Sequence, residues 1–340
     1  MKISIIIPVF NVEPYVERCL KSVMAQTYQG SIECLIVDDC STDKGMDVVK
    51  KAVSAYLGPI VFKILHHEHN RGLSAARNTG MDAATGDYLF FLDSDDEISA
   101  DCIERLAATL KEMHYDLIVG SVRTVGNESL HRGLSLKLDD GVVLCGKEIE
   151  NSYHDKWKMI AVNKLYRKGF IQQQDIRFKE GLVHEDELWS LQVACLAQSL
   201  RAVNKYTYIY YVREDSITTD ADVDARRCSM LKVIVAEIGK FLEERHIFSQ
   251  RAYQLMLKFF WQSLEMSWKD KNTFLSDYVK LREESALPLP YRVRACGLHP
   301  RAQLQNVYYM MAPQMAANII YFFHNLKLKL SKGDLIFRLR

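Results

Sequence analysis

The sequence predicts an α/β fold in which helices flank a mostly parallel sheet, followed by a helical C-terminal region. Three observations support this fold. Short apolar runs alternate with segments of helical periodicity in the first third of the chain. Several of these runs end in polar clusters, and the pattern becomes helical from Asp222 onward. Because 340 residues exceed what one core usually supports, we expect two domains, residues 1–220 and 221–340.

Six segments are predicted to be strands. Each is dominated by aliphatic or aromatic side chains and bounded by polar residues or turn formers, as is typical of strands buried on both faces. In chain order they are residues 3–9, 32–37, 60–65, 88–92, 116–121 and the tyrosine-rich 206–212.

The segments between the first five strands carry apolar side chains at helical spacing. The clearest example is 101–114, where Ile103, Leu106 and Leu110 recur on one face. Helices are expected from about Val16 to Met24, over 45–55, over 74–84 and over 101–114. Strands that alternate with helices in this way form a parallel sheet covered on both sides.

Polar clusters follow three of the first four strands, namely Asp38–Asp39, His66–Arg71 and Asp93–Asp96. Because parallel strands place their carboxyl ends along one edge of the sheet, we expect these clusters to meet. Carboxylates are the ligands that Mg²⁺ and Mn²⁺ prefer, and such ions share their other positions with phosphates. The alternative is that Asp93–Asp96 forms a solvated turn that caps the next helix. The repeated acidic endings favour a metal or nucleotide site.

Composition and motifs exclude several classes of function. A formal net charge of +1 argues against a dedicated nucleic-acid binder. The chain has no GxGxxG, GxxxxGK[ST], HExxH or GxSxG motif, which argues against dinucleotide oxidoreductases, P-loop NTPases, zincins and α/β-hydrolases. The eight cysteines are scattered without a CxxC pair, which indicates free thiols. No apolar run is long enough for a signal peptide or a membrane span, so we expect a cytoplasmic protein.

Five segments, residues 4–11, 20–27, 35–43, 70–80 and 86–96, together resemble the family 2 glycosyltransferases, an inverting family with the GT-A fold. The resemblance covers about the first hundred residues and is specific for the family. It implies a metal-dependent enzyme that moves a sugar from a nucleotide-sugar to a hydroxyl group of a glycan or glycolipid. A UDP-sugar is the favoured donor. Surface polysaccharide biosynthesis is the implied setting.

The resemblance also assigns roles to individual residues. Asp39 would hydrogen-bond the uracil ring, and Asp93-Ser94-Asp95 would be the DxD element that holds Mn²⁺ or Mg²⁺. Asp95 leads as the metal ligand, followed by Asp93 and Asp96. Either Arg71 or Arg77 would approach the diphosphate or the donor sugar, although Arg77 can instead be a helix-start residue paired with a nearby aspartate. The residues assigned to the nucleotide-sugar are Pro8, Val9, Phe10, Glu13, Asp38, Asp39, Arg71, Arg77, Asp93, Ser94 and Arg213.

An inverting transferase needs a general base that takes the proton from the acceptor hydroxyl. In the family this base is the aspartate of a Glu-Asp pair downstream of the DxD element, which corresponds here to Asp186. Alternatively, Glu185–Glu187 is simply the acidic first turn of a helix, favoured by the helix dipole, and both interpretations can hold. His184 is a candidate second metal ligand, an acceptor contact or a surface hydrogen-bonding residue.

Three further segments have expected roles. Residues 163–168 resemble a family segment on the acceptor side of the site, and Arg213 begins an Arg-x-x-Ser-Ile element that would fold over the diphosphate. The helices after Asp222 are expected to shape the acceptor site or to mediate homodimerisation. Residues 316–340 interleave aromatic and basic residues, which suits a helix on the inner face of an anionic membrane. A packed C-terminal helix with a solvated basic face is the alternative.

Two other functions remain as alternatives. A nucleotidyltransferase acting on sugar phosphates shares the α/β architecture and the metal carboxylates, but it normally has a glycine-rich, basic loop after the first strand. Residues 8–13 are neither glycine-rich nor basic. A non-catalytic scaffold with the GT-A fold is the second alternative, and the presence of Asp39, Asp95 and Asp186 argues against it.

Overall fold

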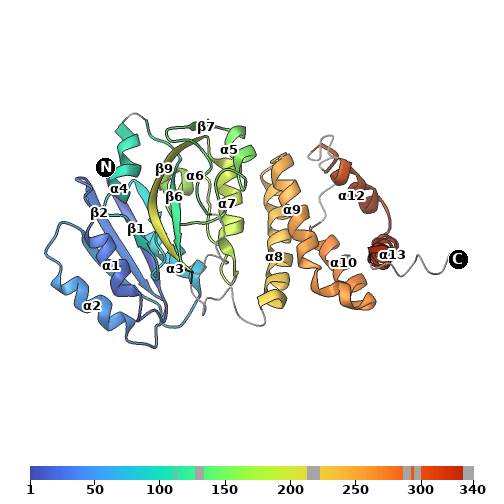
Figure 1. Cartoon of the computed structure of the whole chain (residues 1–340), viewed down its shortest axis with the longest axis horizontal. Coiled ribbons are helices and arrows are strands. Elements are labelled where there is room, and N and C mark those ends of the chain that lie inside the picture. Colours follow the sequence, from blue (N-terminus) through green and yellow to red (C-terminus); the bar gives the residue numbers. More distant parts are fainter. Residues whose placement is uncertain (112, 127–133, 213–222, 286–291, 295–299, 332–340) are drawn as a thin grey trace. The chain divides into compact units, whose positions relative to one another are not determined.

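A computed structural model (Figure 1) describes the chain except for residues 112, 127–133, 213–222, 286–291, 295–299 and 332–340. The chain divides into two compact units, Met1–Ser216 and Ile217–Arg340. The first unit combines a sheet with helices, and the second consists of helices.

The first unit is built on a nine-stranded sheet with the order β3-β2-β1-β4-β8-β6-β9-β5, and β7 also pairs with β9. The strands are β1 (Lys2–Val9), β2 (Ser31–Asp38), β3 (Val61–His66), β4 (Tyr88–Phe91), β5 (Glu97–Ile98), β6 (Leu117–Val125), β7 (Val143–Cys145), β8 (Lys164–Arg167) and β9 (Ser199–Tyr211). Its helices are α1 (Val16–Met24), α2 (Gly45–Ala55), α3 (Leu73–Ala83), α4 (Cys102–Ala108), the 3₁₀ turn η1 (Thr109–Lys111), α5 (Lys147–Ser152), α6 (Lys168–Gln173) and α7 (Glu185–Leu196).

The half of the sheet formed by β1 to β4 is parallel. Strand β1 pairs with β2 on one side and β4 on the other, so that Ile5 lies beside both Cys34 and Phe90. Every residue from Ile3 to Val9 in β1 is buried, as expected for a strand covered on both faces. These pairings place the carboxyl ends of β1, β2 and β4 along one edge of the sheet.

The predicted α/β fold with flanking helices and a helical C-terminal region is confirmed, but the second half of the sheet is mixed. Strand β8 lies between β4 and β6 and runs antiparallel to both. The predicted helix over 101–114 is shorter, because α4 ends at Ala108 and continues only as the 3₁₀ turn η1. The tyrosine-rich strand β9 is longer than predicted and starts at Ser199.

Helix α3 packs closely against the sheet, and Gly80 makes this possible. A Cβ atom added at Gly80 would lie 2.4 Å from Cγ2 of Ile6, in the middle of β1. The missing side chain therefore lets the helix backbone approach the strand. This contact sets the position of the preceding turn of α3, which carries Arg77.

The second unit contains α8 (Val223–Glu244), α9 (Gln250–Ser263), the 3₁₀ turn η3 (Met266–Lys269), α10 (Lys271–Ser285), α12 (Pro300–Met310) and α13 (Pro313–Ser331). The apolar stripe predicted for α8 is buried, with Ile234, Val235 and Leu242 fully inaccessible. The side chain of Arg282 on α10 donates to the main-chain oxygens of Tyr308, Tyr309 and Met311 and so satisfies carbonyls at the end of α12. Among the described residues, no helix is both long and apolar enough to cross a bilayer.

Candidate active site

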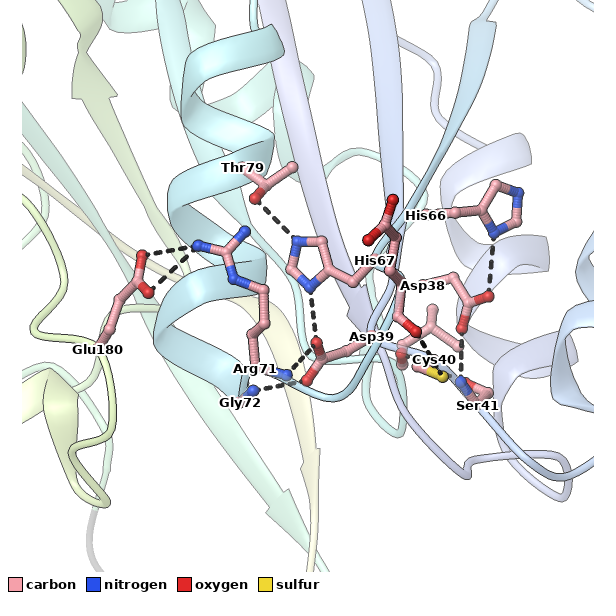
Figure 2. A network of polar contacts seen from close by, with 12 residues as sticks. Asp38, Asp39, Cys40, Ser41, His66, His67, Arg71, Gly72, Thr79 and Glu180 are labelled. Carbon is pink, nitrogen blue, oxygen red and sulfur yellow. Dashed lines mark hydrogen bonds and ion pairs between the residues drawn. The ribbon is translucent and has the colours of Figure 1, made fainter.

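Asp39, directly after β2, is the centre of a hydrogen-bond network (Figure 2). Its Oδ1 accepts from the backbone N–H of Arg71 at 2.8 Å and hydrogen-bonds Nδ1 of His67 at 2.6 Å. Its Oδ2 accepts from the backbone N–H of Gly72 at 2.7 Å, and the side chain is only 4% exposed. Asp39 thus fixes the turn that leads into α3. Three of the roughly four acceptor positions of a carboxylate are occupied, which leaves capacity for about one further donor.

Asp38 has a more local role than its neighbour. Its Oδ1 accepts from the backbone N–H of Ser41, and its Oδ2 lies 3.0 Å from Nδ1 of His66 at the end of β3. The side chain therefore holds the loop after β2 against the adjacent strand (Figure 2). The assignment of Asp38 to the nucleotide-sugar stays a prediction.

The loop after β1 is tied to the loop after β2 through hydrogen bonds. The side chain of Asn11, whose φ is 51°, accepts from the backbone N–H of Thr42, and Glu13 accepts from that of Lys44. Pro8 and Val9 are buried at the end of the strand, whereas Phe10 is 45% exposed. An exposed aromatic ring at this edge is suited to contact a flat ligand such as a nucleobase.

The acidic residues after β4 differ from one another in burial. Asp96 is only 1% exposed; its Oδ2 accepts from the Tyr208 hydroxyl at 2.7 Å and its Oδ1 from the backbone N–H of Tyr211 at 2.9 Å. Burial raises the pKa of Asp96 well above its ordinary value, and Asp95 and Asp93 raise it further. The sequence predicts Asp96 as a third metal ligand. In the structure both of its oxygens accept internal hydrogen bonds, and Asp96 is the least accessible of the three aspartates.

Asp93 and Asp95 are more accessible. The side chain of Asp93 is 31% exposed and shares its Oδ1 with Arg77, while Asp95 is partly exposed. Ser94 between them is buried. The backbone carbonyl of Asp95 accepts from Arg18, whose guanidinium also pairs with Glu97 at the start of β5. The DxD element therefore presents two carboxylates, one of which is already in contact with a cation.

The two candidate arginines have different surroundings. Arg77 on α3 is 3% exposed, and its guanidinium pairs with Asp93 at 2.8 Å and Glu185 at 2.5 Å. Burial would lower the pKa of Arg77, but the carboxylates of Asp93, Glu185 and Asp186 outweigh it and raise the pKa. Arg71 is more exposed and pairs with Glu180 at 3.2 Å (Figure 2). Arg77 thus matches the interpretation as a residue paired to a nearby aspartate, and Arg71 is the arginine that is accessible to a ligand.

Asp186 lies in the first turn of α7, after His184, which adopts the left-handed conformation as the N-cap residue. Glu185 is buried and Asp186 is partly buried. Burial raises the pKa of Asp186 well above its ordinary value, Glu185 and Glu187 raise it further, and Arg77 lowers it. A carboxylate with a raised pKa at a helix start is suited to act as a general base.

Lys164, in the predicted acceptor-side segment, is a buried amine at the start of β8. Its Nζ donates to the main-chain oxygens of Ile160 and Val162. Burial lowers the pKa of Lys164 to about 7, and the nearby Asp186 partly opposes this change. The segment thus places an amine that is only partly charged at neutral pH close to the candidate base. Arg213, the remaining predicted ligand of the diphosphate, lies outside the described residues.

A divalent cation such as Mg²⁺ needs several oxygen ligands around one position. Among the described residues, no group of three or more His, Cys, Asp or Glu side chains is arranged to hold a metal ion. Asp93 and Asp95 supply two accessible carboxylates at the carboxyl end of β4. Such a pair fits an ion whose remaining ligands are phosphate oxygens and water, as Mg²⁺ commonly has, and it does not form a closed protein site.

Several residues of this site are not singled out by the sequence. His67 and Tyr208 support Asp39 and Asp96, and Glu180 pairs with Arg71. The only signal in the sequence is that His67 belongs to the polar cluster His66–Arg71, which follows a predicted strand. The partners of Asp96 and Arg71 are more than a hundred residues away in the chain, so no local pattern reveals them.

Comparison with known proteins identifies a protein family and several relatives of this chain. The family model described as "Glycosyl transferase family 2" matches residues 4–174. "Glycosyltransferase GlyA" of Streptococcus pneumoniae is 34% identical over 227 residues, which are 64% of this chain and 31% of that protein. "Poly(ribitol-phosphate) beta-N-acetylglucosaminyltransferase TarP" of Staphylococcus aureus is 27% identical over 82% of this chain and 88% of its own length. The chain spans well under half of the first curated relatives, 31% of GlyA and 42% of each of two S. aureus TarS proteins.

Solved structures show the same fold. The structure of residues 1–349 of S. aureus TarS in complex with UDP-GlcNAc superposes with a TM-score of 0.70 at 21% identity, covering 98% of this chain and 92% of that one. The mannosyltransferase PcManGT from Pyrobaculum calidifontis, in complex with GDP-Man and Mn²⁺, superposes with a TM-score of 0.54 at 15% identity. These likenesses confirm the predicted GT-A fold.

Proposed function

The chain belongs to glycosyl transferase family 2, and on this premise we propose that it is an inverting glycosyltransferase. It moves a sugar from a nucleotide-sugar to a hydroxyl group of a glycan or glycolipid, in the synthesis of a surface polysaccharide. The observation that carries the proposal is the Arg77 bridge. This bridge joins Asp93 of the DxD element to Glu185, the neighbour of the candidate base Asp186.

A UDP-sugar is the proposed donor. A solved structure of TarS contains UDP-GlcNAc. The similar S. aureus proteins TarS and TarP are both named poly(ribitol-phosphate) beta-N-acetylglucosaminyltransferases. The remaining acceptor capacity of Asp39 matches the single N–H on the pairing edge of uracil, although the low exposure of Asp39 makes its approach narrow. Phe10 and Arg71 lie at the same edge of the sheet and are exposed enough to contact the nucleotide.

The proposed reaction is a single displacement. Asp186 accepts the proton of the acceptor hydroxyl while the oxygen of this hydroxyl forms a bond to the anomeric carbon. The bond between that carbon and the diphosphate breaks on the opposite face, and UDP leaves with the electron pair. The configuration at the anomeric carbon is therefore inverted. The raised pKa of Asp186 suits it to accept this proton.

Asp93 and Asp95 are the residues that would hold Mn²⁺ or Mg²⁺. When bound, such an ion neutralises the diphosphate and stabilises the charge on the leaving UDP. The chain's own contribution is the orientation of these carboxylates. Asp93 is fixed by Arg77, and the main chain at Asp95 is fixed by Arg18.

The second unit is proposed to contact the acceptor or the inner face of the cell membrane. Large apolar side chains on α12 and α13 are exposed, namely Met310, Met315, Phe322 and Phe323. Residues 286–340 contain eight Lys or Arg and a single Asp, so this part of the sequence is strongly basic. Exposed aromatic residues with basic neighbours favour binding to an anionic bilayer.

Vesicle flotation tests this membrane contact. We expect the chain to bind vesicles that contain anionic lipid and not neutral vesicles, and the double substitution Phe322→Ser and Phe323→Ser to weaken binding. Leu57→Ser, at an exposed position of the first unit, is the matched control and should bind like the wild type. A dimer that the double substitution dissociates would instead assign this face to a second copy of the chain.

The proposed activity is tested by a screen of nucleotide-sugars. UDP-GlcNAc, UDP-Glc, UDP-Gal, GDP-Man and dTDP-sugars are each added with and without Mn²⁺, and the melting temperature and the release of nucleotide are recorded. We expect stabilisation and release of UDP with at least one UDP-sugar. Release of pyrophosphate from a nucleoside triphosphate and a sugar phosphate would support the nucleotidyltransferase instead. No binding of any nucleotide-sugar would support the non-catalytic scaffold.

A further inference from the structure

The guanidinium of Arg77 connects three parts of the first unit that are distant in sequence. Arg77 lies on α3, one of its terminal nitrogens is 2.8 Å from Oδ1 of Asp93 after β4, and the other is 2.5 Å from Oε1 of Glu185 on α7. Arg77 and Glu185 are both buried, and only Asp93 is partly exposed. A single side chain therefore holds the DxD element and the start of α7 at fixed positions relative to each other.

The start of α7 is held a second time by stacked rings. The guanidinium carbon of Arg77 lies 5.1 Å from the centre of the Phe178 ring. This ring in turn stacks on Trp189 with the centroids 4.1 Å apart and the planes nearly parallel. Trp189 is one turn beyond Glu185 on α7. Arg77 thus fixes the first turn of this helix through an ion pair at its start and through an aromatic ring at the next turn.

Asp186 lies in this fixed turn, next to Glu185. The carboxylate of Asp186 is close enough to Arg77 to raise the pKa of its guanidinium. The ion pairs of Arg77 itself are made with Asp93 and Glu185. A base must sit within hydrogen-bonding reach of the hydroxyl that it deprotonates, so a small shift of the turn would misplace it. Arg77 is well suited to prevent such a shift, because its planar fork can serve two carboxylates at once.

We infer that Arg77 is a positioning residue, which sets the place of the base Asp186 relative to the donor carboxylate Asp93 by holding Glu185. This inference rests on the proposed transferase function and adds a residue to it. Arg77 itself would not touch the donor sugar or the acceptor. Its effect should therefore fall on the chemical step and not on the binding of the nucleotide in the absence of a metal ion.

Arg77→Lys tests the inference, because a lysine keeps the positive charge but cannot bridge both carboxylates in the same geometry. We expect kcat to fall about 10- to 100-fold while the Kd for UDP, measured without a metal ion, stays close to the wild-type value. Arg177→Lys is the matched control. Both terminal nitrogens of Arg177 donate to the carboxylate of Asp82 on α3, and neither residue belongs to the candidate site. This variant should keep its kcat.

Glu185→Gln examines the same link from the other side and serves if Arg77→Lys does not fold. We expect a loss of kcat of the same kind, and the double variant should be no slower than the slower single variant. A wild-type kcat in either single variant, losses that multiply in the double variant, or a loss confined to UDP affinity would overturn the inference. If the wild type releases UDP and the variants have the same kcat, only the inference about Arg77 is refuted. If the wild type shows no turnover at all, the proposed function is refuted.

Discussion

The two acidic strand ends of the sheet resemble each other in sequence and differ in structure. After β2, the carboxylates of Asp38 and Asp39 are engaged by backbone N–H groups and by His66 and His67 (Figure 2). After β4, Asp93 is partly exposed and its one ion pair is with a side chain, Arg77. Both ends lie on the same edge of the sheet, on strands that flank β1.

The difference shows what each end can do. Backbone N–H groups cannot leave, so Asp39 is a fixed acceptor that can add about one neutral donor such as a base N–H. A carboxylate that is partly exposed and already balanced by a guanidinium can share its other lone pairs with a metal ion or a substrate cation. We therefore expect changes after β2 to act on stability and nucleoside binding. Changes to the residues after β4, or to Arg77, which connects them to α7, should lower the rate of the chemical step.

The largest expected effect is that of Asp186→Asn. Removing the base should lower kcat by about 10²- to 10⁴-fold, because an amide cannot accept the acceptor proton. The fold should not suffer. The pKa of Asp186 is raised in the folded state, so its charged form destabilises the protein at neutral pH and the neutral amide relieves this. Steady-state kinetics together with thermal unfolding measure both effects, and a variant that retains wild-type kcat would refute the assignment of the base.

Asp39→Asn should have the next largest effect, and it should fall on stability. The amide replaces one carboxylate oxygen by an NH2 group, which faces either the N–H of Gly72 or the N–H of Arg71 and the ring of His67, so we expect a loss of about 2–3 kcal/mol. Asp38→Asn, the matched control on the same strand end, has fewer buried donors to leave unpaired and should cost about 1 kcal/mol. Urea unfolding compares the two. Equal losses would mean that Asp39 is not the centre of this network.

The pH dependence of the reaction should reflect Asp186. Because its pKa is raised, the base is protonated and inactive at low pH. Thus kcat/KM should rise about tenfold per pH unit up to this pKa and then level off. The charged groups near the base are Arg77, Asp93, Lys164, Glu185 and Glu187. A kcat/KM that stays constant from pH 5 to 8 would show that the protonation of Asp186 does not control the reaction of the free enzyme.

The smallest expected effect concerns Lys164. Its pKa of about 7 in the folded state is below that of an unfolded lysine, so the unfolded chain binds more protons above pH 7. This residue should therefore make the protein more stable as the pH rises from 7 to 8, by at most about 1.4 kcal/mol per pH unit. Comparing the slope for the wild type with that for Lys164→Met isolates its contribution. Identical slopes would mean that the folded protein keeps Lys164 charged throughout.

Much of the first half of the fold can be predicted from the sequence. Strands β1, β2 and β4 are read from short apolar runs, because strands buried on both faces leave an uninterrupted hydrophobic signal. Strand β3 is also read from such a run, although it lies at the edge of the sheet and none of its residues is buried. Strand β8 cannot be found in this way. It is four residues long, contains Lys164 and Arg167, and joins the sheet between strands that precede it in the chain. The mixed second half of the sheet follows from this insertion.

The site is predicted only as far as residue types and strand ends reveal it. The sequence places Asp39 and Asp93 at one edge of the sheet, but it does not distinguish the enclosed Asp96 from the accessible Asp93. That distinction depends on Tyr208 and Tyr211, which β9 brings from more than a hundred residues away. The link between Arg77 and Glu185 likewise spans 108 positions and leaves no local pattern.

The most direct test of the account is the affinity for UDP measured by calorimetry with and without Mn²⁺ in the wild type, Asp95→Asn and Asp39→Asn. We expect Mn²⁺ to strengthen binding to the wild type. Asp95→Asn should lose this enhancement while keeping the metal-free affinity, and Asp39→Asn should bind more weakly to the same extent under both conditions. An Mn²⁺ enhancement that survives in Asp95→Asn, or an affinity indifferent to Mn²⁺ in the wild type, would contradict the assignment of the diphosphate to the end of β4.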